Sequence, residues 1–324
     1  MRPAFAVMFA VTIAAASWVV VSARQQTPLP LPRGLEFTPQ GVRGEAVWPA
    51  FEGWGPLRDG TNVLLLGYYN RNKEQELDIP IGPNNNIEPG GPDYGQPTHF
   101  HVGRQWGVFA IQLPKEFSTK RLTWTLIANG QKAAVTFWMN PAYWINFFTH
   151  AASGNTPPVV RFSLNGQELT GPPPGIAQEL SGVVGQPVTL TLWASDKPPT
   201  YKAPEPPDGG RDQGRGTDRA ANFDVSAALG RSGAGGRGRE SGPPADVTVI
   251  WKKYRGSGEV RIADERTRLF SKGDVNAVME ATTTATFSAP GEYWLRAQVN
   301  DASGDGGGGD QCCWTTAHVK VLVK

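Results

Sequence analysis

The sequence predicts an all-β protein built from two antiparallel β-sandwich domains. Short segments alternate between apolar and polar side chains, which is the period of a half-buried strand. Turn dipeptides such as Asp59-Gly60 and Asn129-Gly130 are typical of connections between such strands. With 39 glycines and 28 prolines among 324 residues, long helices are disfavoured. At roughly 100–200 residues per domain, this length suggests two domains.

The N-terminal segment predicts export. Residues 4–21 carry no charge, follow a basic residue and lead into the small-residue cleavage site Val21-Ser22-Ala23. This order is typical of a secretory signal peptide, residues 1–23, with cleavage after Ala23; an uncleaved membrane anchor is the alternative. We expect a secreted or periplasmic chain with no membrane span after cleavage. Residues 24–44, rich in proline and glycine, predict a linker.

The first predicted domain is an antiparallel β domain over residues 45–150. Its clearest expected strands are 62–69, 75–81, 106–113, 121–128 and 132–139. No helical pattern alternates with them, so a doubly wound or barrel α/β enzyme is disfavoured.

The second predicted domain, residues 156–324, alternates more regularly. Its expected strands are 159–164, 186–194, 246–254, 282–287, 291–300 and 315–323. The residues expected to face its core are Ala285, Phe287, Tyr293, Leu295, Ala297, Val299, Val319, Val321 and Val323.

A short segment of the second domain resembles a known architecture. Residues 289–295 (APGEYWL) resemble the tyrosine corner of immunoglobulin-like and PKD-like sandwiches, and Trp251 stands where a strand C tryptophan would. Leu295 takes the strand F cysteine position, and Leu190 or Leu192 the strand B position, so the inter-sheet disulfide is absent. The whole chain resembles uncharacterised secreted bacterial β-sandwich proteins with such a C-terminal module. The resemblance implies a fold and a location, not an activity.

Residues 196–245 form a low-complexity insertion between the predicted strands B and C. Glycine and proline supply 17 of its 50 residues, whereas Leu, Ile, Val and Phe supply only 3. Such a composition is typical of disorder. Because the B–C and F–G loops leave an immunoglobulin-like sandwich at the same end, we expect the insertion and the glycine-rich loop 301–313 to face the first domain.

The glycine-rich loop holds two candidate features. Adjacent Cys312 and Cys313 predict a strained vicinal disulfide that acts as a structural clasp; links to another chain and two separate thiols are the alternatives. Asp301, Asp305 and Asp310 offer carboxylates to a calcium ion. Their spacing fits no calcium-binding repeat, so solvated turn aspartates are the simpler interpretation.

Two further groups bear on metal binding or hydrolysis. His99 and His101 share one face of an extended segment, which is a start on a zinc or copper site, but no third ligand stands at a recognisable spacing. Glu74, Glu76 and Asp78 share one face of a predicted strand, and paired carboxylates serve as acid and base in glycoside cleavage. A polar loop face and a solvated strand face are the simpler interpretations.

Aromatic residues of the first domain are the remaining candidates. Trp48, Trp54 and Trp144 lie in turn-rich segments and are expected at the surface, where their rings can stack on sugars. Tyr94 lies in the polar loop 84–96, which suits either a hydrogen-bonded ligand or a self-packed loop.

Composition and missing motifs decide the functional prediction. A net charge of +2 gives no electrostatic footprint for nucleic acid, and neither a nucleophile elbow nor a P-loop is present. We therefore expect a secreted, non-enzymatic binding or interaction module of the cell envelope, whose partner is an unknown envelope protein or a glycan. No cofactor is expected, apart from calcium under the hypothesis above. The alternatives are a carbohydrate-binding protein that uses first-domain aromatics and a metal-binding or hydrolytic protein.

Overall fold

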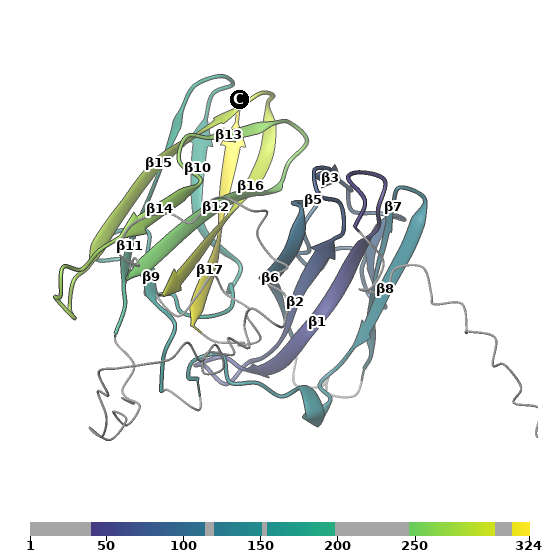
Figure 1. Cartoon of the computed structure of the whole chain (residues 1–324), viewed down its shortest axis with the longest axis horizontal. Helices are drawn as coiled ribbons and strands as arrows, with labels where there is room; N and C mark the ends of the chain where they lie inside the picture. The colour runs from purple at the N-terminus through teal and green to yellow at the C-terminus, as the bar shows by residue number, and fades with distance from the viewer. Residues whose placement is uncertain (1–39, 114–119, 151–153, 198–245, 302–312) are drawn as a thin grey trace, which may run out of the picture. The chain divides into compact units, whose positions relative to one another are not determined.

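The computed structural model describes residues 40–113, 120–150, 154–197, 246–301 and 313–324 (Figure 1). The predicted signal peptide, the linker up to residue 39 and insertion residues 198–245 lie outside these ranges, as do Asp305, Asp310 and Cys312. The described residues belong to one contact unit, Gln40–Lys324, and the predicted boundaries at 150 and 156 stay predictions. The all-β prediction is confirmed, because the described residues form seventeen strands and one short 3-10 helix.

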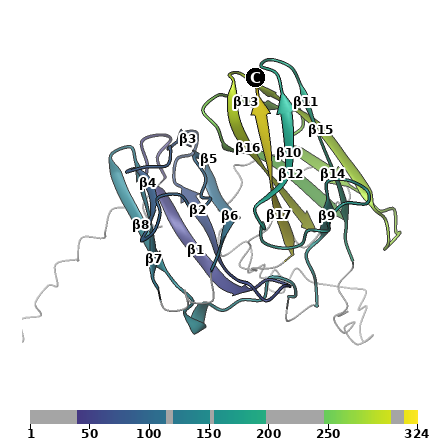
Figure 2. The ribbon, with the colours of Figure 1, turned by 180° about the vertical axis from the view of Figure 1, so that it is seen from behind.

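The first set of strands forms two facing sheets with a small extra ladder (Figure 2). Its members are β1 (Val47–Pro56), β2 (Asn62–Asn70) and β6 (Gly103–Gln112) in one sheet, β4 (Asn85–Glu88), β7 (Leu122–Ala128) and β8 (Gln131–Phe137) in the other, and β3 (Leu77–Asp78) with β5 (His99–Phe100). Apolar side chains from both sheets, including Leu64, Phe109 and Trp124, fill the space between them. Burial of such side chains is the main stabilising contribution to this sandwich.

In this region one strand was missed and one predicted strand is too long. β1 was not expected, because its two glycines and two prolines read as turns; yet Gly53 has φ of +133° at a register shift of the β1–β2 pairing, a place where glycine is tolerated in a strand. The expected strand 75–81 shrinks to Leu77–Asp78. Glu74 therefore lies in a bend ahead of the strand rather than on one face with Glu76 and Asp78.

The second set of strands forms a sandwich with the immunoglobulin strand order. One sheet runs β13-β15-β11-β9 and the other β10-β17-β16-β12-β14, as in the ABED and CFG sheets of that fold. The strands are β9 (Val159–Arg161), β10 (Ile176–Gly182), β11 (Val188–Ser195), β12 (Val247–Arg255), β13 (Val260–Ile262), β14 (Arg266–Leu269), β15 (Met279–Phe287), β16 (Gly291–Asp301) and β17 (Trp314–Val323). All pairings are antiparallel except that of β10 with β17.

The core of this sandwich matches the expected inward residues. All nine of them are buried, and Trp251 and Leu295 lie in the same apolar cluster. The hydroxyl of Tyr293 donates to the carbonyl of Ala289 at 2.8 Å, which is the bond of a tyrosine corner. The immunoglobulin-like prediction is therefore confirmed at the level of strand order and core.

The outward face of β12, β16 and β17 is buried as well. Most of its buried residues are polar (Arg296, Gln298, Asn300, Thr316 and His318), and two are aromatic (Tyr254 and Trp314). They contact the first strands, since His318 Nε2 donates to the Val108 carbonyl at 3.1 Å and Lys252 Nζ donates to Gln105 Oε1 at 3.0 Å. We call this contact region the polar junction. It is formed by a sheet face. The insertion and the glycine-rich loop, both expected to face the first domain, lie outside the described residues except at 196–197, 301 and 313.

Candidate functional site

An aromatic shelf follows the last strand of the first sandwich. The 3-10 helix η2 (Pro141–Tyr143) begins after Asn140, whose side-chain oxygen accepts a hydrogen bond from the Ala142 N–H at 3.1 Å. Tyr143 and Trp144 stand beside each other with 52% and 53% of their surfaces exposed. We call these two residues the aromatic shelf.

The shelf is attached to β1. The Trp54 indole N–H donates to the Asn140 carbonyl at 2.6 Å, and the Ile145 N–H donates to the Trp54 carbonyl at 2.9 Å. The ring of Phe51 packs edge-on against Tyr143 with centroids 5.6 Å apart. These contacts on both sides of η2 hold the backbone of the turn and the Tyr143 ring in a defined place.

The predicted aromatic candidates separate into different environments. Trp144 is exposed, as expected. Trp48 and Trp54 are half-buried on strand β1 rather than in turns, and Trp54 packs against the core. Tyr94 is half-buried too, and its hydroxyl donates to the Pro89 carbonyl at 2.6 Å within its own loop, as the self-packed interpretation expects. The structure brings only Trp54 and Trp144 together, through a backbone bridge.

Of the proposed calcium ligands, only Asp301 is described. It is the last residue of β16, is buried, and accepts a hydrogen bond from Asn155 Nδ2 at 2.5 Å. Burial and the nearby Asp301 carboxylate raise the pKa of Asp196 to about 7. The calcium site stays a prediction.

Only one residue of the cysteine pair, Cys313, is among the described residues. Cys313 is disulfide-bonded and has φ of +83°, whereas Cys312 lies outside the described residues. The vicinal pairing therefore stays a prediction.

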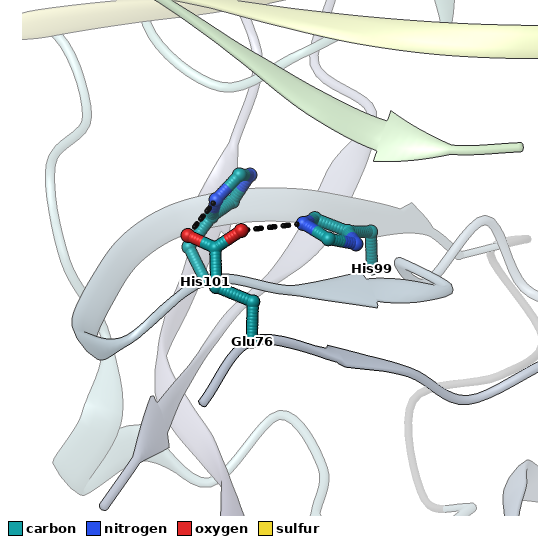
Figure 3. A group of neighbouring side chains, drawn as sticks. All are labelled: Glu76, His99 and His101. Carbon is teal, nitrogen blue, oxygen red and sulfur yellow. Dashed lines mark hydrogen bonds and ion pairs between the residues drawn. The ribbon is translucent and has the colours of Figure 1, made fainter. Parts of the chain in front are cut away.

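A cluster of Glu76, His99 and His101 lies at the edge of the polar junction (Figure 3). His99 opens strand β5, His101 follows it, and Glu76 immediately precedes the paired strand β3. Because β3 and β5 pair antiparallel, the Glu76 carboxylate reaches both rings. Its Oε2 lies 3.1 Å from His99 Nε2, and its Oε1 lies 3.0 Å from His101 Nδ1. Glu76 is thus the third candidate metal ligand, which the spacing of the two histidines in the sequence did not reveal.

The remaining ring nitrogens contact other groups. His99 Nδ1 lies 2.8 Å from Asp78 Oδ1, and His101 Nε2 lies 2.8 Å from the carbonyl of Lys253 on β12. The Lys253 ammonium also donates to Asp78 Oδ1 at 3.0 Å. Glu76 and Asp78 are thus engaged carboxylates, which corrects the interpretation of a merely solvated strand face.

Burial opposes charge on each member of the cluster. Burial would raise the pKa of Glu76, but the contacts with His101 and His99 hold that pKa well below its usual value. Burial would lower the pKa of His99, but Asp78 and Glu76 raise it. Burial lowers the pKa of His101 to about 4, and Glu76 offsets this only in part. The contacts within the cluster therefore favour the ionised form of Glu76 and the protonated form of His99, whereas burial favours the neutral form of His101.

A surface pocket of about 250 Å³ opens next to the cluster. Its lining includes Asp78 and Thr98 from the first strands and Arg255 and Trp294 from the second sandwich. Asp93 forms a two-pronged ion pair with Arg255 nearby, at 3.0 and 2.7 Å. Sequence reasoning missed the contributions of Lys253 and Arg255, because nothing in the sequence shows that β12 lies against this cluster.

Comparisons with known proteins add little to this description. No protein-family model matches the chain, and no curated protein matches it. Among solved structures, the D00-D0 domain of Intimin is similar at 12% sequence identity and a TM-score of 0.24, over 86% of this chain and 100% of that one. At this TM-score the likeness supports no inference about fold or function. None of the helical structure in the described ranges is long and apolar enough to cross a membrane.

Proposed function

We propose that this chain is a secreted, non-enzymatic binding module of the cell envelope that binds a glycan on the aromatic shelf. The observation that carries the proposal is the exposure of two consecutive aromatic residues, Tyr143 and Trp144, on a turn attached to β1. Large rings held in place lose little conformational entropy when a ligand packs on them. The N-terminal sequence pattern supports secretion.

The surroundings of the shelf favour a neutral polyhydroxylated ligand. Residues 138–148 (WMNPAYWINFF) contain no charged side chain of their own, so the segment itself offers no electrostatic steering toward a charged protein. Arg58 and Arg121 stack on Phe148 and Trp138 at its two ends. Its two asparagines, Asn140 and Asn146, carry amide groups of the kind that hydrogen-bond hydroxyls. Aromatic faces supply the apolar contact that the C–H face of a sugar ring needs.

The test is binding to a panel of neutral polysaccharides and purified peptidoglycan, followed by tryptophan fluorescence and affinity electrophoresis. We expect Trp144→Ala to weaken binding at least about tenfold, as truncation of a central aromatic contact does. Phe270→Ala is the matched control, because Phe270 is an exposed ring (43%) that follows β14 of the second sandwich. Equal binding by the native chain and Trp144→Ala would refute the shelf as the site.

The secretion part has its own test. Intact mass and N-terminal sequencing of the chain expressed in a bacterium with a standard export system should show a mature form that begins at Arg24. A product that keeps Met1 and stays in the cytoplasm would contradict it.

A further inference from the structure

The Glu76, His99 and His101 cluster has the geometry of a metal site that is separate from the aromatic shelf. One ligand atom from each residue lies within 4.8 Å of the other two, and both rings face the same carboxylate (Figure 3). Ligands of a tetrahedral zinc ion, about 2.0–2.2 Å from the metal, lie roughly 3.3–3.6 Å apart. The observed spacings need only small side-chain rotations to reach that geometry.

The hydrogen bonds on the far side of each ring have the pattern that metal-binding histidines use. Such a histidine donates its other N–H to a carboxylate or a backbone carbonyl, which fixes the ring and its tautomer. Here His99 Nδ1 faces the Asp78 carboxylate at 2.8 Å, and His101 Nε2 faces the Lys253 carbonyl at 2.8 Å. The nitrogens left over, Nε2 of His99 and Nδ1 of His101, are those that point at Glu76.

With a single ring proton, His101 cannot satisfy both of its hydrogen-bond contacts. Both of its nitrogens face pure acceptors, the Glu76 carboxylate at 3.0 Å and the Lys253 carbonyl at 2.8 Å. A neutral imidazole has one N–H, so one of the two contacts joins two acceptors whichever nitrogen holds it. A metal ion between Nδ1 and Oε1 lets Nε2–H donate to the carbonyl.

We propose that Glu76, His99 and His101 bind one divalent transition-metal ion of the zinc type. Two imidazoles and one carboxylate suit a borderline ion rather than calcium, which prefers an all-oxygen set. Access is open, since the Glu76 side chain is 45% exposed, and solvent completes the coordination there. Lys253 and Lys252 do not block the ion, because their ammonium groups donate to Asp78 and Gln105.

Metal binding would stabilise the polar junction. Glu76 and the two histidines come from the β3–β5 segment, whereas the carbonyl that orients His101 belongs to Lys253 on β12. An ion on His101 polarises its Nε2–H and strengthens that hydrogen bond. The bound ion therefore links the small β3–β5 ladder more tightly to the second sandwich.

The experiment is a calorimetric titration of the purified full chain with Zn²⁺, after removal of metal by a chelator. We expect one equivalent to bind with micromolar or tighter affinity. At a free concentration about 100 times Kd, the melting temperature should rise by about 5–10 °C. Absence of saturable binding would overturn the proposal.

Two matched variants locate the ion. Glu76→Gln should weaken binding at least about tenfold. Asp93→Asn removes another half-exposed junction carboxylate, the one paired with Arg255, and should bind Zn²⁺ as the native chain does. Equal affinity of the two variants would overturn the proposal.

A measurement on the native chain alone covers the case in which Glu76→Gln does not fold. The chain has four histidines, so proton–nitrogen correlation NMR spectra can resolve the ring signals of each one. We expect one equivalent of Zn²⁺ to shift the ring resonances of His99 and His101 and to leave those of His150 and His318 in place. Shifts confined to His150 would contradict the site.

Discussion

In the sheet that contains β12, β16 and β17, both faces of these three strands carry buried residues, yet the two faces differ chemically. The inward face carries apolar residues such as Trp251 and Leu295. The outward face of β16 carries Arg296, Gln298 and Asn300, which hydrogen-bond to one another along the strand. From Leu295 to Asn300, each apolar inward residue is followed by a buried polar outward one.

In this sheet, a face that carries polar side chains is therefore not necessarily exposed to solvent. The inward face was fully predictable, since alternation and burial coincide there. The outward face has a composition typical of a solvent-exposed surface. It is buried because β12, β16 and β17 pack against the first strands, including β5 and β6. A buried polar face requires partners for its hydrogen-bonding groups, which makes the junction specific but costly to disturb.

The largest expected effect is on the inward face. Leu295→Ala removes a fully buried side chain beside Trp251 and should lower the free energy of unfolding by about 3–4 kcal/mol, through lost burial and a residual cavity. Chemical denaturation measures it. A loss below about 1 kcal/mol would show that this core is loosely packed.

The neighbouring residue tests the outward face. Arg296 is buried, and its Nη2 donates to Gln298 Oε1 at 2.7 Å and to Gln105 Oε1 at 3.4 Å. Arg296→Ala should cost about 2 kcal/mol, because it removes charge-assisted bonds and leaves the buried amide oxygen of Gln298 without this donor. A surface arginine would cost within about 0.5 kcal/mol, so an effect that small would contradict a buried junction.

A smaller effect concerns pH. Burial lowers the pKa of His318 to about 3, whereas an unfolded histidine has a pKa of about 6.5. Between these values the unfolded chain binds the extra proton, so the free energy of unfolding falls as pH falls. His318→Phe keeps the stacking on Tyr254 and should flatten this slope by about 1 kcal/mol per pH unit between about pH 6 and 5. An unchanged slope would mean that native His318 takes up protons freely.

The smallest expected effect is at the edge of the junction. Asp93 is 47% exposed and pairs with Arg255 at 2.7 Å. The same pairing holds the pKa of Asp93 below its usual value, although burial alone would raise it. Solvent screens a pair at this exposure, so Asp93→Asn should cost only about 0.5 kcal/mol, and less at high salt. A cost above about 2 kcal/mol would show that this edge is as buried as the centre.

The fold could be predicted from the sequence where alternation and burial coincide. The tyrosine corner at Tyr293 and the inward residues of β15, β16 and β17 are confirmed. Strand β1 was missed because its glycines and prolines mimic a turn, and a register shift at Gly53 accommodates them. The strand predicted over residues 75–81 was too long, because the polar residues on either side of the two-residue strand β3 alternate with apolar ones by chance.

The candidate site was predictable only in part. His99 and His101 were identified from their spacing, but Glu76 was assigned to a separate acidic face, because only the pairing of β3 with β5 brings them together. The carbonyl of Lys253 is 152 residues away from His101, and a backbone atom leaves no sequence signal. Trp144 was correctly expected at the surface, whereas Trp54 was expected exposed and instead supports the shelf.

The most direct test of the buried polar junction is the reactivity of His318 toward diethylpyrocarbonate, measured by peptide mass spectrometry in the native and urea-unfolded chain. Neutral exposed imidazoles react, while His318 is buried, stacked on Tyr254 and hydrogen-bonded to Val108. We expect native His318 to react at least tenfold more slowly than in the unfolded chain, with partly exposed His150 much less protected. Equal rates for His318 in the native and unfolded chain would show an open sheet face and contradict the junction.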